Sequence, residues 1–188
     1  MSSNASSEVR VGLVSTACGV FEKLGVSDRV PPLLEHEAKA SSAPIRYMDM
    51  LAAYWEGHGD AQKSLEWSAR AYYEAREPTA KFGHGVEYAV RLIRLRPLES
   101  GSIRDVSVAV IGELDDPDKR GLLTNPQKLA RLDSALRDWN RSGEHRDAIS
   151  VIRHRMDDVC GKVSPSDPAG RTCADFLSPA TRGLLSRS

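Results

Sequence analysis

The hydrophobic positions of this chain recur mostly at the spacing of an α-helix. Leu129, Leu132 and Leu136 lie three or four residues apart and lead to Trp139, with charged residues between them. This spacing places apolar side chains on one face of a helix and charges on the other. The β-branched run 106–111 is the one stretch that alternates like a strand, and it also fits a helix ending near Gly112. The pattern therefore predicts an all-α protein.

The same periodicity, read with the proline and glycine positions, gives a map of the chain. Two breaks combine proline with residues that favour turns, at 115–118 and 164–168. We expect a flexible N-terminus at 1–7, a single helical domain at 8–161, and a proline-containing loop and C-terminal tail at 162–188. The predicted helices span residues 6–24, 28–40, 45–57, 60–76, 79–95, 101–114, 125–141 and 145–161.

An internal repeat connects several of these helices. Phe21-Glu22-Lys23-Leu24-Gly25 aligns with Trp55-Glu56-Gly57-His58-Gly59, and the same offset carries Pro44, at the close of one unit, onto Pro78. The offset matches the period of about 34 residues of the tetratricopeptide helix–turn–helix repeat. The segment from Trp139 to Gly143 repeats the aromatic-to-glycine spacing and predicts a further hairpin. We therefore expect a right-handed array of antiparallel helical hairpins of the tetratricopeptide type.

The first copy of the repeat fits less well than the second. Its second helix contains Pro31-Pro32, which a helix tolerates only in its first turn. We therefore expect that helix to begin just before the prolines, with Ser27 or Asp28 as its N-cap.

Composition narrows the class of protein. The chain has 188 residues, of which 40% are hydrophobic and 28% charged, and its 26 basic and 26 acidic residues give a formal net charge of zero. A disordered chain would combine low hydrophobicity with a large net charge, and a nucleic-acid-binding protein would carry a basic excess. No apolar stretch suits a membrane helix or a signal-peptide core, which predicts a cytoplasmic protein. We expect neither a membrane nor a nucleic-acid partner.

The three cysteines have different expected roles, one as a core residue and two as a possible disulfide pair. Cys18 falls on the apolar side of the first predicted helix and is expected to be a small core residue. Cys160 and Cys173 flank the proline-containing loop, and a chain that turns there could bring them within disulfide range. The alternative is that both are reduced and buried, because a reducing compartment opposes disulfides.

Candidate chemistry elsewhere is weak. The five histidines form no metal-ligand pair, and Cys-x-x-Cys is absent, so no metal, cofactor or catalytic residue is predicted. Phe82-Gly83-His84-Gly85 lacks the features of a phosphate loop and is expected to serve helix packing or bending. Arg91, Arg94 and Arg96 are expected to form a solvated helix end. Asp115-Asp116 and Asp157-Asp158 are adjacent carboxylates that point in different directions.

The stretch from Pro78 to Pro97 carries a specific resemblance. Its order Pro-x-x-x-Phe-x-x-Gly, leading into a helix that ends in Arg-Leu-Arg-Pro, resembles the helical C-terminal region that follows the thioredoxin domain in a group of bacterial thioredoxin-family proteins. The resemblance extends over nearly the whole chain, to Gly59-Asp60, Leu65-Glu66-Trp67, Leu136-Arg137-Asp138-Trp139-Asn140, Cys160, Asp167-Pro168, Arg171, Cys173 and Phe176-Leu177. His84 stands where that group more often has a large aromatic residue.

The resemblance implies a helical, tetratricopeptide-like accessory module without the redox Cys-x-x-Cys. Proteins of that group are typically exported, which would place this chain in the periplasm and favour the Cys160–Cys173 disulfide.

Three functions follow as hypotheses. The first is a non-catalytic scaffold that binds a protein or peptide partner on stacked hairpins. Its candidate contact residues are Tyr47, Trp55, Arg70, Tyr72 and His84, although each could instead be core or plain surface. The second is a detached accessory domain of a thioredoxin-like thiol–disulfide oxidoreductase system. The third, least favoured, is a small enzyme with Glu87 or Tyr88 beside His84.

Overall fold

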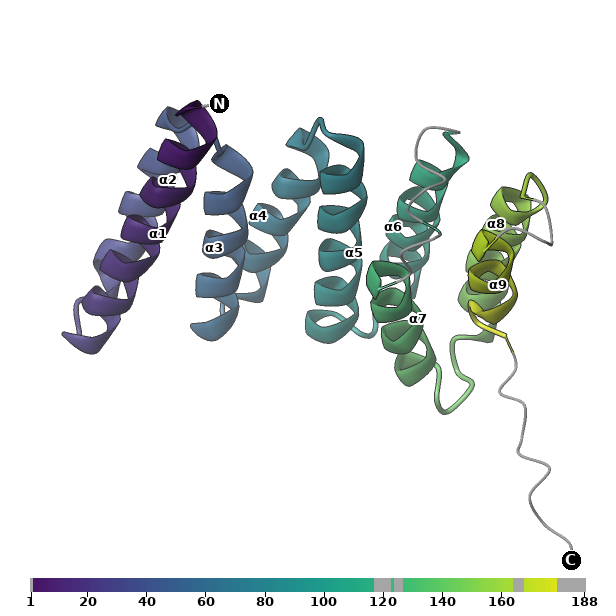
Figure 1. The fold of residues 1–188 in the computed structure, drawn as a ribbon. Coiled ribbons are helices and arrows are strands. Elements are labelled where there is room, and N and C mark those ends of the chain that lie inside the picture. The colour runs from purple at the N-terminus through teal and green to yellow at the C-terminus, as the bar shows by residue number, and fades with distance from the viewer. Residues whose placement is uncertain (1, 117–122, 124–126, 164–167, 179–188) are drawn as a thin grey trace, which may run out of the picture. The chain divides into compact units, whose positions relative to one another are not determined.

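The protein is all-α, and its helices pack largely as sequential antiparallel pairs (Figure 1). A computed structural model describes residues 2–116, 123, 127–163 and 168–178. Within these residues lie nine α-helices and two short 3₁₀ turns. The prediction of an all-α fold is confirmed, and residues 106–111 are helical rather than extended.

The chain forms two compact units that divide within α5, between Arg91 and Leu92. The predicted helical domain at 8–161 includes parts of both units. Unit 1 contains α1 (Ser2–Lys23), η1 (Ser27–Arg29), α2 (Val30–Ala40), α3 (Pro44–Gly57), α4 (Ala61–Glu74) and most of α5 (Pro78–Leu95). Unit 2 contains α6 (Ser100–Gly112), η2 (Glu113–Asp115), α7 (Gln127–Trp139), α8 (Arg146–Cys160) and α9 (Pro168–Asp175).

Prolines and acidic caps set where the helices of unit 1 begin. Pro44 and Pro78, 34 positions apart in the chain, are each the first residue of a helix, where the missing N–H of proline has no intrahelical partner to lose. Asp60 caps α4 by accepting a hydrogen bond from the Lys63 amide at 3.0 Å. Glu77 accepts hydrogen bonds from the Thr79 and Ala80 amides at the start of α5. These backbone hydrogen bonds lower the pKa of both carboxyl groups.

The repeated aromatic-to-glycine spacing has a local explanation. Gly25, Gly59 and Gly143 are the glycines with positive φ in the described part of the chain, at 74°, 78° and 80°. After α1 and α3 the amide that follows the glycine bonds back to the aromatic carbonyl, Val26 to Phe21 and Asp60 to Trp55, both at 2.9 Å. This is the Schellman ending of a helix, in which glycine takes the left-handed position. The shared aromatic-to-glycine spacing therefore follows from the way in which these helices end.

The start of α2 differs from the expectation in one detail. Pro31 and Pro32 do lie in its first turn, as predicted. Ser27 and Asp28, however, belong to the turn η1, and the N-cap residue of α2 is Arg29, which makes no side-chain capping hydrogen bond. The 3₁₀ turn leads the chain directly into the helix, so no capping side chain is used.

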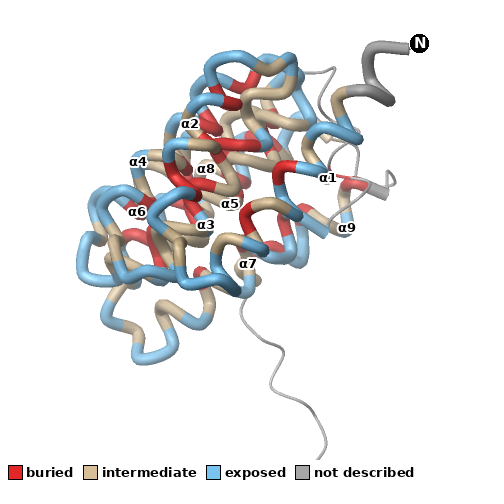
Figure 2. The backbone as a smooth tube through the Cα atoms, turned by 90° about the vertical axis from the view of Figure 1, so that its left-hand side faces the viewer, coloured by how far each residue is buried: buried red, intermediate tan, exposed pale blue. Residues whose placement is uncertain are grey.

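The core of unit 1 lies where α1, α2, α3 and α4 face one another. Leu34, Met48 and Leu51 are fully buried there, and Cys18 is buried among them as predicted. Burial raises the pKa of the Cys18 thiol. Figure 2 shows that buried positions alternate with exposed ones along each helix, as expected for helices with one apolar face.

Unit 2 buries the stripe that the sequence identified. Leu129, Leu132 and Leu136 of α7 are buried, and α6 packs against α8 through residues such as Ile103 and Ile152. The predicted helical hairpin around Gly143 corresponds to α7 and α8. Helix α9 is not predicted by the sequence pattern, which assigns 162–188 to a loop and tail.

Two other expectations about the chain can be placed. The first helix spans Ser2–Lys23 and so includes most of the segment 1–7. The proline breaks at 115–118 and 164–168 lie largely outside the described residues, although Asp115 and Asp116 end η2 as the first break predicts.

Candidate functional site

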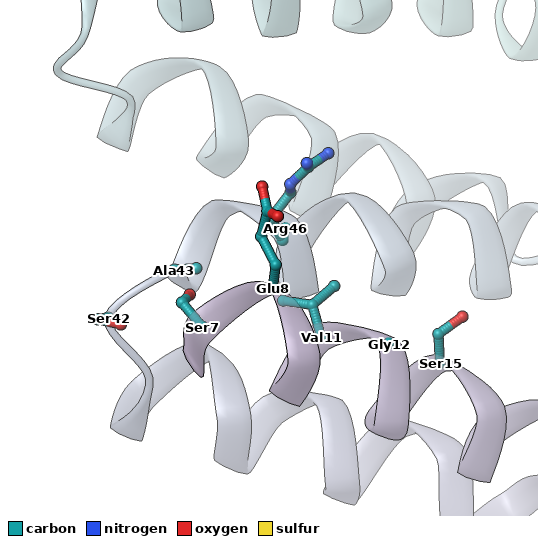
Figure 3. A pocket seen from close by; sticks show the side chains of 8 residues that line it. All are labelled: Ser7, Glu8, Val11, Gly12, Ser15, Ser42, Ala43 and Arg46. Atoms are coloured by element: carbon teal, nitrogen blue, oxygen red, sulfur yellow. The ribbon is translucent and has the colours of Figure 1, made fainter. Parts of the chain in front are cut away.

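A groove in unit 1 runs between the N-terminal halves of α1 and α3 and encloses about 630 Å³ (Figure 3). Pockets of this size hold a small molecule or a few residues of a peptide. Two segments far apart in the chain meet there, namely α1 and the α2–α3 connection with the first turn of α3. The groove is lined by Ser7, Glu8, Val11, Gly12, Ser15, Ser42, Ala43 and Arg46.

The local sequence explains why a groove forms at this place. Helical spacing puts Glu8, Gly12 and Ser15 on one face of α1, and two of these three side chains are small. A Cβ added at Gly12 would meet nothing within 4 Å, so the space is open. The α2–α3 connection is held in place by the Ser41 hydroxyl, which accepts a hydrogen bond from the Ala43 amide at 3.1 Å. The absence of bulky side chains on this face leaves room for a ligand.

Two opposite charges stand at the groove. Glu8 and Arg46 come from different helices, and both line the groove (Figure 3). Both are exposed, and within the described residues neither forms an ion pair or a side-chain hydrogen bond. Their charges are therefore available to a ligand, together with the hydroxyl groups of Ser7, Ser15 and Ser42.

A second pair of charged residues in unit 1, unlike Glu8 and Arg46, forms an ion pair within the chain. Arg10 of α1 donates two hydrogen bonds to the Glu37 carboxylate of α2, both at 2.7 Å. Glu37 is only 5% exposed. The Arg10 guanidinium lowers the pKa of Glu37, and the buried Tyr47 hydroxyl adds to this effect from nearby, without forming a hydrogen bond of normal geometry. This pair fixes α1 against α2 behind the groove.

Helices α3 and α5 are joined by two polar contacts. The Arg91–Glu56 contact is an ion pair, and the His84–Asp49 contact is one only when the histidine is protonated. His84 Nδ1 lies 3.2 Å from Asp49 Oδ2, and Arg91 donates to Glu56 at 2.9 Å and to the Ser68 hydroxyl of α4 at 2.8 Å. The two pairs are seven positions apart on each helix, in the same order. Helices α3 and α5 therefore run in the same direction, and each pair joins positions 35 apart in the chain. Arg91 does not belong to a solvated helix end, because it is largely buried among three helices.

A cation–aromatic surface covers part of α3 and α4. Lys63 Nζ lies 3.9 Å from the centre of the Trp55 ring, and the Arg70 guanidinium lies 4.4 Å from that of Trp67. The Trp55 Nε1 atom is buried without a hydrogen-bond partner in the described part of the chain. This surface is distinct from the groove lining.

The structure separates the five residues that the sequence singled out. Tyr47 is 0% and Tyr72 3% exposed, which takes both out of any surface that contacts a partner. Trp55 and Arg70 lie on the cation–aromatic surface, and His84 is held by Asp49. None of the five lines the groove. Gly12, Ser15 and Arg46 of the groove lining were missed from the sequence. The available signal was the pair of small residues, Gly12 and Ser15, on one face of a helix.

Cys160 and Cys173 are joined in a disulfide, with Cα atoms 5.7 Å apart. The bond links the end of α8 to α9. Phe82-Gly83-His84-Gly85 lies within the continuous helix α5, with Phe82 and Gly85 buried, as expected for helix packing. In the part of the chain that the structure describes, no cluster of three or more histidine, cysteine or acidic side chains is arranged to hold a metal ion.

Comparisons with known proteins identify no relative: no family model, curated protein or solved structure matches this chain. None of the described helices is both long and apolar enough to cross a membrane.

Proposed function

We propose that this protein is a non-catalytic helical-repeat module of the tetratricopeptide type that binds an extended peptide segment of a partner protein. The observation that carries the proposal is the groove between α1 and α3 with its unpaired charges, Glu8 and Arg46. Helical arrays commonly bind extended segments on surfaces formed by successive hairpins. Here the groove joins the first helices of two successive hairpins.

The helical geometry of unit 1 supports the repeat assignment. Successive hairpins of such an array place equivalent helices parallel, about 34 residues apart. The pairs Asp49–His84 and Glu56–Arg91 join α3 to α5 across 35 positions, and the two helices begin at the prolines that the repeat aligns. The Schellman endings at Gly25 and Gly59 are also one repeat length apart. These features support two consecutive units of one repeat, formed by α1–α2 and α3–α4.

The groove also indicates the chemistry of the peptide. A peptide backbone needs donors and acceptors along its length, and the three serine hydroxyls supply both. Arg46 suits an acidic side chain of the peptide and Glu8 a basic one. The preferred ligand is therefore a segment of mixed charge, with one acidic and one basic residue separated by small or apolar residues that fit against Val11 and Ala43.

A displayed library of random linear peptides tests the proposal. We expect selection on the wild-type protein to enrich peptides with an acidic residue at one position, and Arg46→Glu to weaken their binding at least tenfold. A peptide in which that acidic residue is replaced by lysine should regain binding to the Arg46→Glu protein. Arg29→Glu, an exposed charge reversal in η1 outside the groove, is the matched control and should leave binding unchanged.

Two results would contradict this function. Enrichment of no peptide above background would remove peptide binding as the role of the module. Enriched peptides that bind the Arg46→Glu protein as well as the wild type would move the binding site out of the groove.

A second function is favoured by the Cys160–Cys173 disulfide. Disulfides persist in oxidising compartments, where an accessory domain of a thioredoxin-like oxidoreductase system would act. Titration calorimetry against purified thioredoxin-fold proteins of the same organism tests this proposal. Saturable binding would support it, and the lack of binding to each of them would remove it.

A further inference from the structure

Helix α1, continued by Leu24, whose amide bonds back to the Val20 carbonyl, carries a second apolar face that the fold leaves uncovered. Val9, Leu13, Val20 and Leu24 are 64%, 67%, 45% and 71% exposed. At 100° per residue these four side chains fall within a sector of about 60°, so they form one stripe, about 22 Å long, on the outside of the helix. Most large apolar side chains of this protein are buried, and a stripe of four on one helix is typical of an interaction surface.

The outer stripe is separate from the other two faces of α1. Val14 and Cys18 point into the core of unit 1, on roughly the opposite side of the helix. The groove is lined by Glu8, Gly12 and Ser15, which lie between the core face and the outer stripe. A molecule that covered the outer stripe would therefore leave the peptide groove open, and the two surfaces can be tested independently.

The positions of the stripe are symmetric along the helix. Val9 and Leu24 lie equally far from the midpoint between Thr16 and Ala17, and so do Leu13 and Val20. If two copies of α1 pack antiparallel about a two-fold axis at this midpoint, Val9 of each copy faces Leu24 of the other and Leu13 faces Val20. A self-complementary patch of this kind is what a two-fold symmetric dimer requires, because each partner presents the same surface.

The small residues and the charges agree with this arrangement. Thr16 and Ala17 lie at the midpoint, where the two helices would approach most closely. Lys23 lies on one flank of the stripe. In the antiparallel register it faces the same flank of the other copy at the level of position 10, while Glu8 lies further round the helix, on the groove face. Arg10, on the opposite flank, is held by Glu37 of its own chain, so no two like charges are brought together.

We propose that two copies of this protein associate through an antiparallel pairing of their α1 helices along the stripe Val9, Leu13, Val20 and Leu24. The contact is a single helical face and is smaller than the roughly 800 Å² per partner of a standard stable interface. The dimer is therefore expected to dissociate in the micromolar range. This association goes beyond peptide binding and does not depend on it.

Sedimentation equilibrium of the full chain over a range of micromolar concentrations tests the association. We expect the wild type to shift from monomer to dimer, and Leu13→Glu to weaken the dimer about a hundredfold, because the substitution removes a buried leucine from both copies of the interface. Leu13 is exposed, so the far-ultraviolet circular dichroism of the variant should match that of the wild type. Leu98→Glu, at an exposed leucine of unit 2, is the control and should dimerise normally.

A cross-linking experiment tests the register. In a Cys18→Ser background, mixing a Leu13→Cys protein with a Val20→Cys protein should give the mixed disulfide dimer as the main product under mild oxidation. Preferential cross-linking of Leu13→Cys to itself would indicate parallel helices and would overturn the antiparallel arrangement.

Other occupants of the stripe would give different results. A wild type that stays monomeric at all concentrations, or a Leu13→Glu protein that dimerises as well as the wild type, would overturn the proposal. A monomeric wild type that binds vesicles of anionic lipid through Leu13 would assign the stripe to a membrane surface instead.

Discussion

The two units of the chain are held together in different ways. Unit 1 consists of helices of 11 residues or more that share an apolar core, with ion pairs such as Arg10–Glu37 and Arg91–Glu56 at its edges. Unit 2 ends in the eight-residue helix α9, which the disulfide joins to α8. So short a helix is not stable alone. In unit 2 the disulfide and polar contacts therefore hold α9 in place, whereas in unit 1 the packing of apolar side chains holds the helices together.

Hydrogen bonds from α7 and α8 hold the backbone of residues 175–178. Arg137 of α7 donates hydrogen bonds to the Asp175 and Ser178 carbonyls, and Arg153 of α8 donates to the Phe176 carbonyl. Leu177 has a positive φ of 49°, which is unfavourable for a leucine, and its amide donates to Asp133 at 2.6 Å. Side chains of α7 and α8 thus hold the backbone that follows α9.

The largest expected effect comes from the two cores. Leu51→Ala in unit 1 and Leu136→Ala in unit 2 each remove a side chain that is fully buried. Each should lower the free energy of unfolding by about 3 kcal/mol, measured by urea denaturation. Amide hydrogen exchange should then rise mainly in α3 and α4 for Leu51→Ala, and in α7 and α8 for Leu136→Ala. Equal acceleration in both units by either substitution would contradict the division of the chain.

Loss of the disulfide should affect unit 2 nearly as much. On the chain-entropy account, opening a loop of this length costs about 3 kcal/mol, and in this fold the cost falls on α9 and the residues after it. We expect reduction to expose the amides of α9 while those of α3 stay protected. Mass spectrometry of the native protein should find Cys18 as the free thiol and Cys160 joined to Cys173. Three free thiols would show that no disulfide joins α9 to α8.

The ion pairs of unit 1 should contribute less than its core. Arg91→Ala removes the largely buried ion pair with Glu56 and the hydrogen bond to Ser68 and should cost about 2 kcal/mol. Arg76→Ala, at an exposed arginine near the end of α4, is the control and should change stability by less than about 0.5 kcal/mol. If the two variants are equally stable, the link between α3, α4 and α5 contributes nothing measurable.

Acid should weaken both units through a carboxylate in each. Arg10 lowers the pKa of Glu37 in unit 1, and Lys162 and Arg155 lower that of Asp115 in unit 2. A carboxyl group whose pKa is lower in the folded state stabilises the fold fully above its unfolded value of about 4. It loses that contribution as the pH falls through the folded value.

Urea denaturation at several values between pH 7 and pH 3 checks this effect, the smallest of the four. Glu37→Gln and Asp115→Asn should each make stability less dependent on pH in this acidic range. An unchanged pH dependence in both variants would show that other carboxyl groups govern the acid response.

The helical class and most helix positions can be read from the amino-acid pattern alone, because these depend on local chemistry. The spacing of Leu129, Leu132 and Leu136 identifies a helix face wherever the helix packs, and Gly25 and Gly59 end helices through their own backbone freedom. Helix α9 was missed because eight residues after a proline-rich stretch give too short a pattern, and its anchors come from α7 and α8.

The tertiary structure determines which side chains are exposed and can contact another molecule. Tyr47 and Tyr72 are aromatic residues of a type common in binding surfaces, yet the packing of unit 1 buries them. Arg46 and Glu8 are far apart in the chain and line the same groove only because α1 and α3 fold together in unit 1. Exposure and proximity depend on contacts between distant segments, and local patterns along the chain do not encode those contacts.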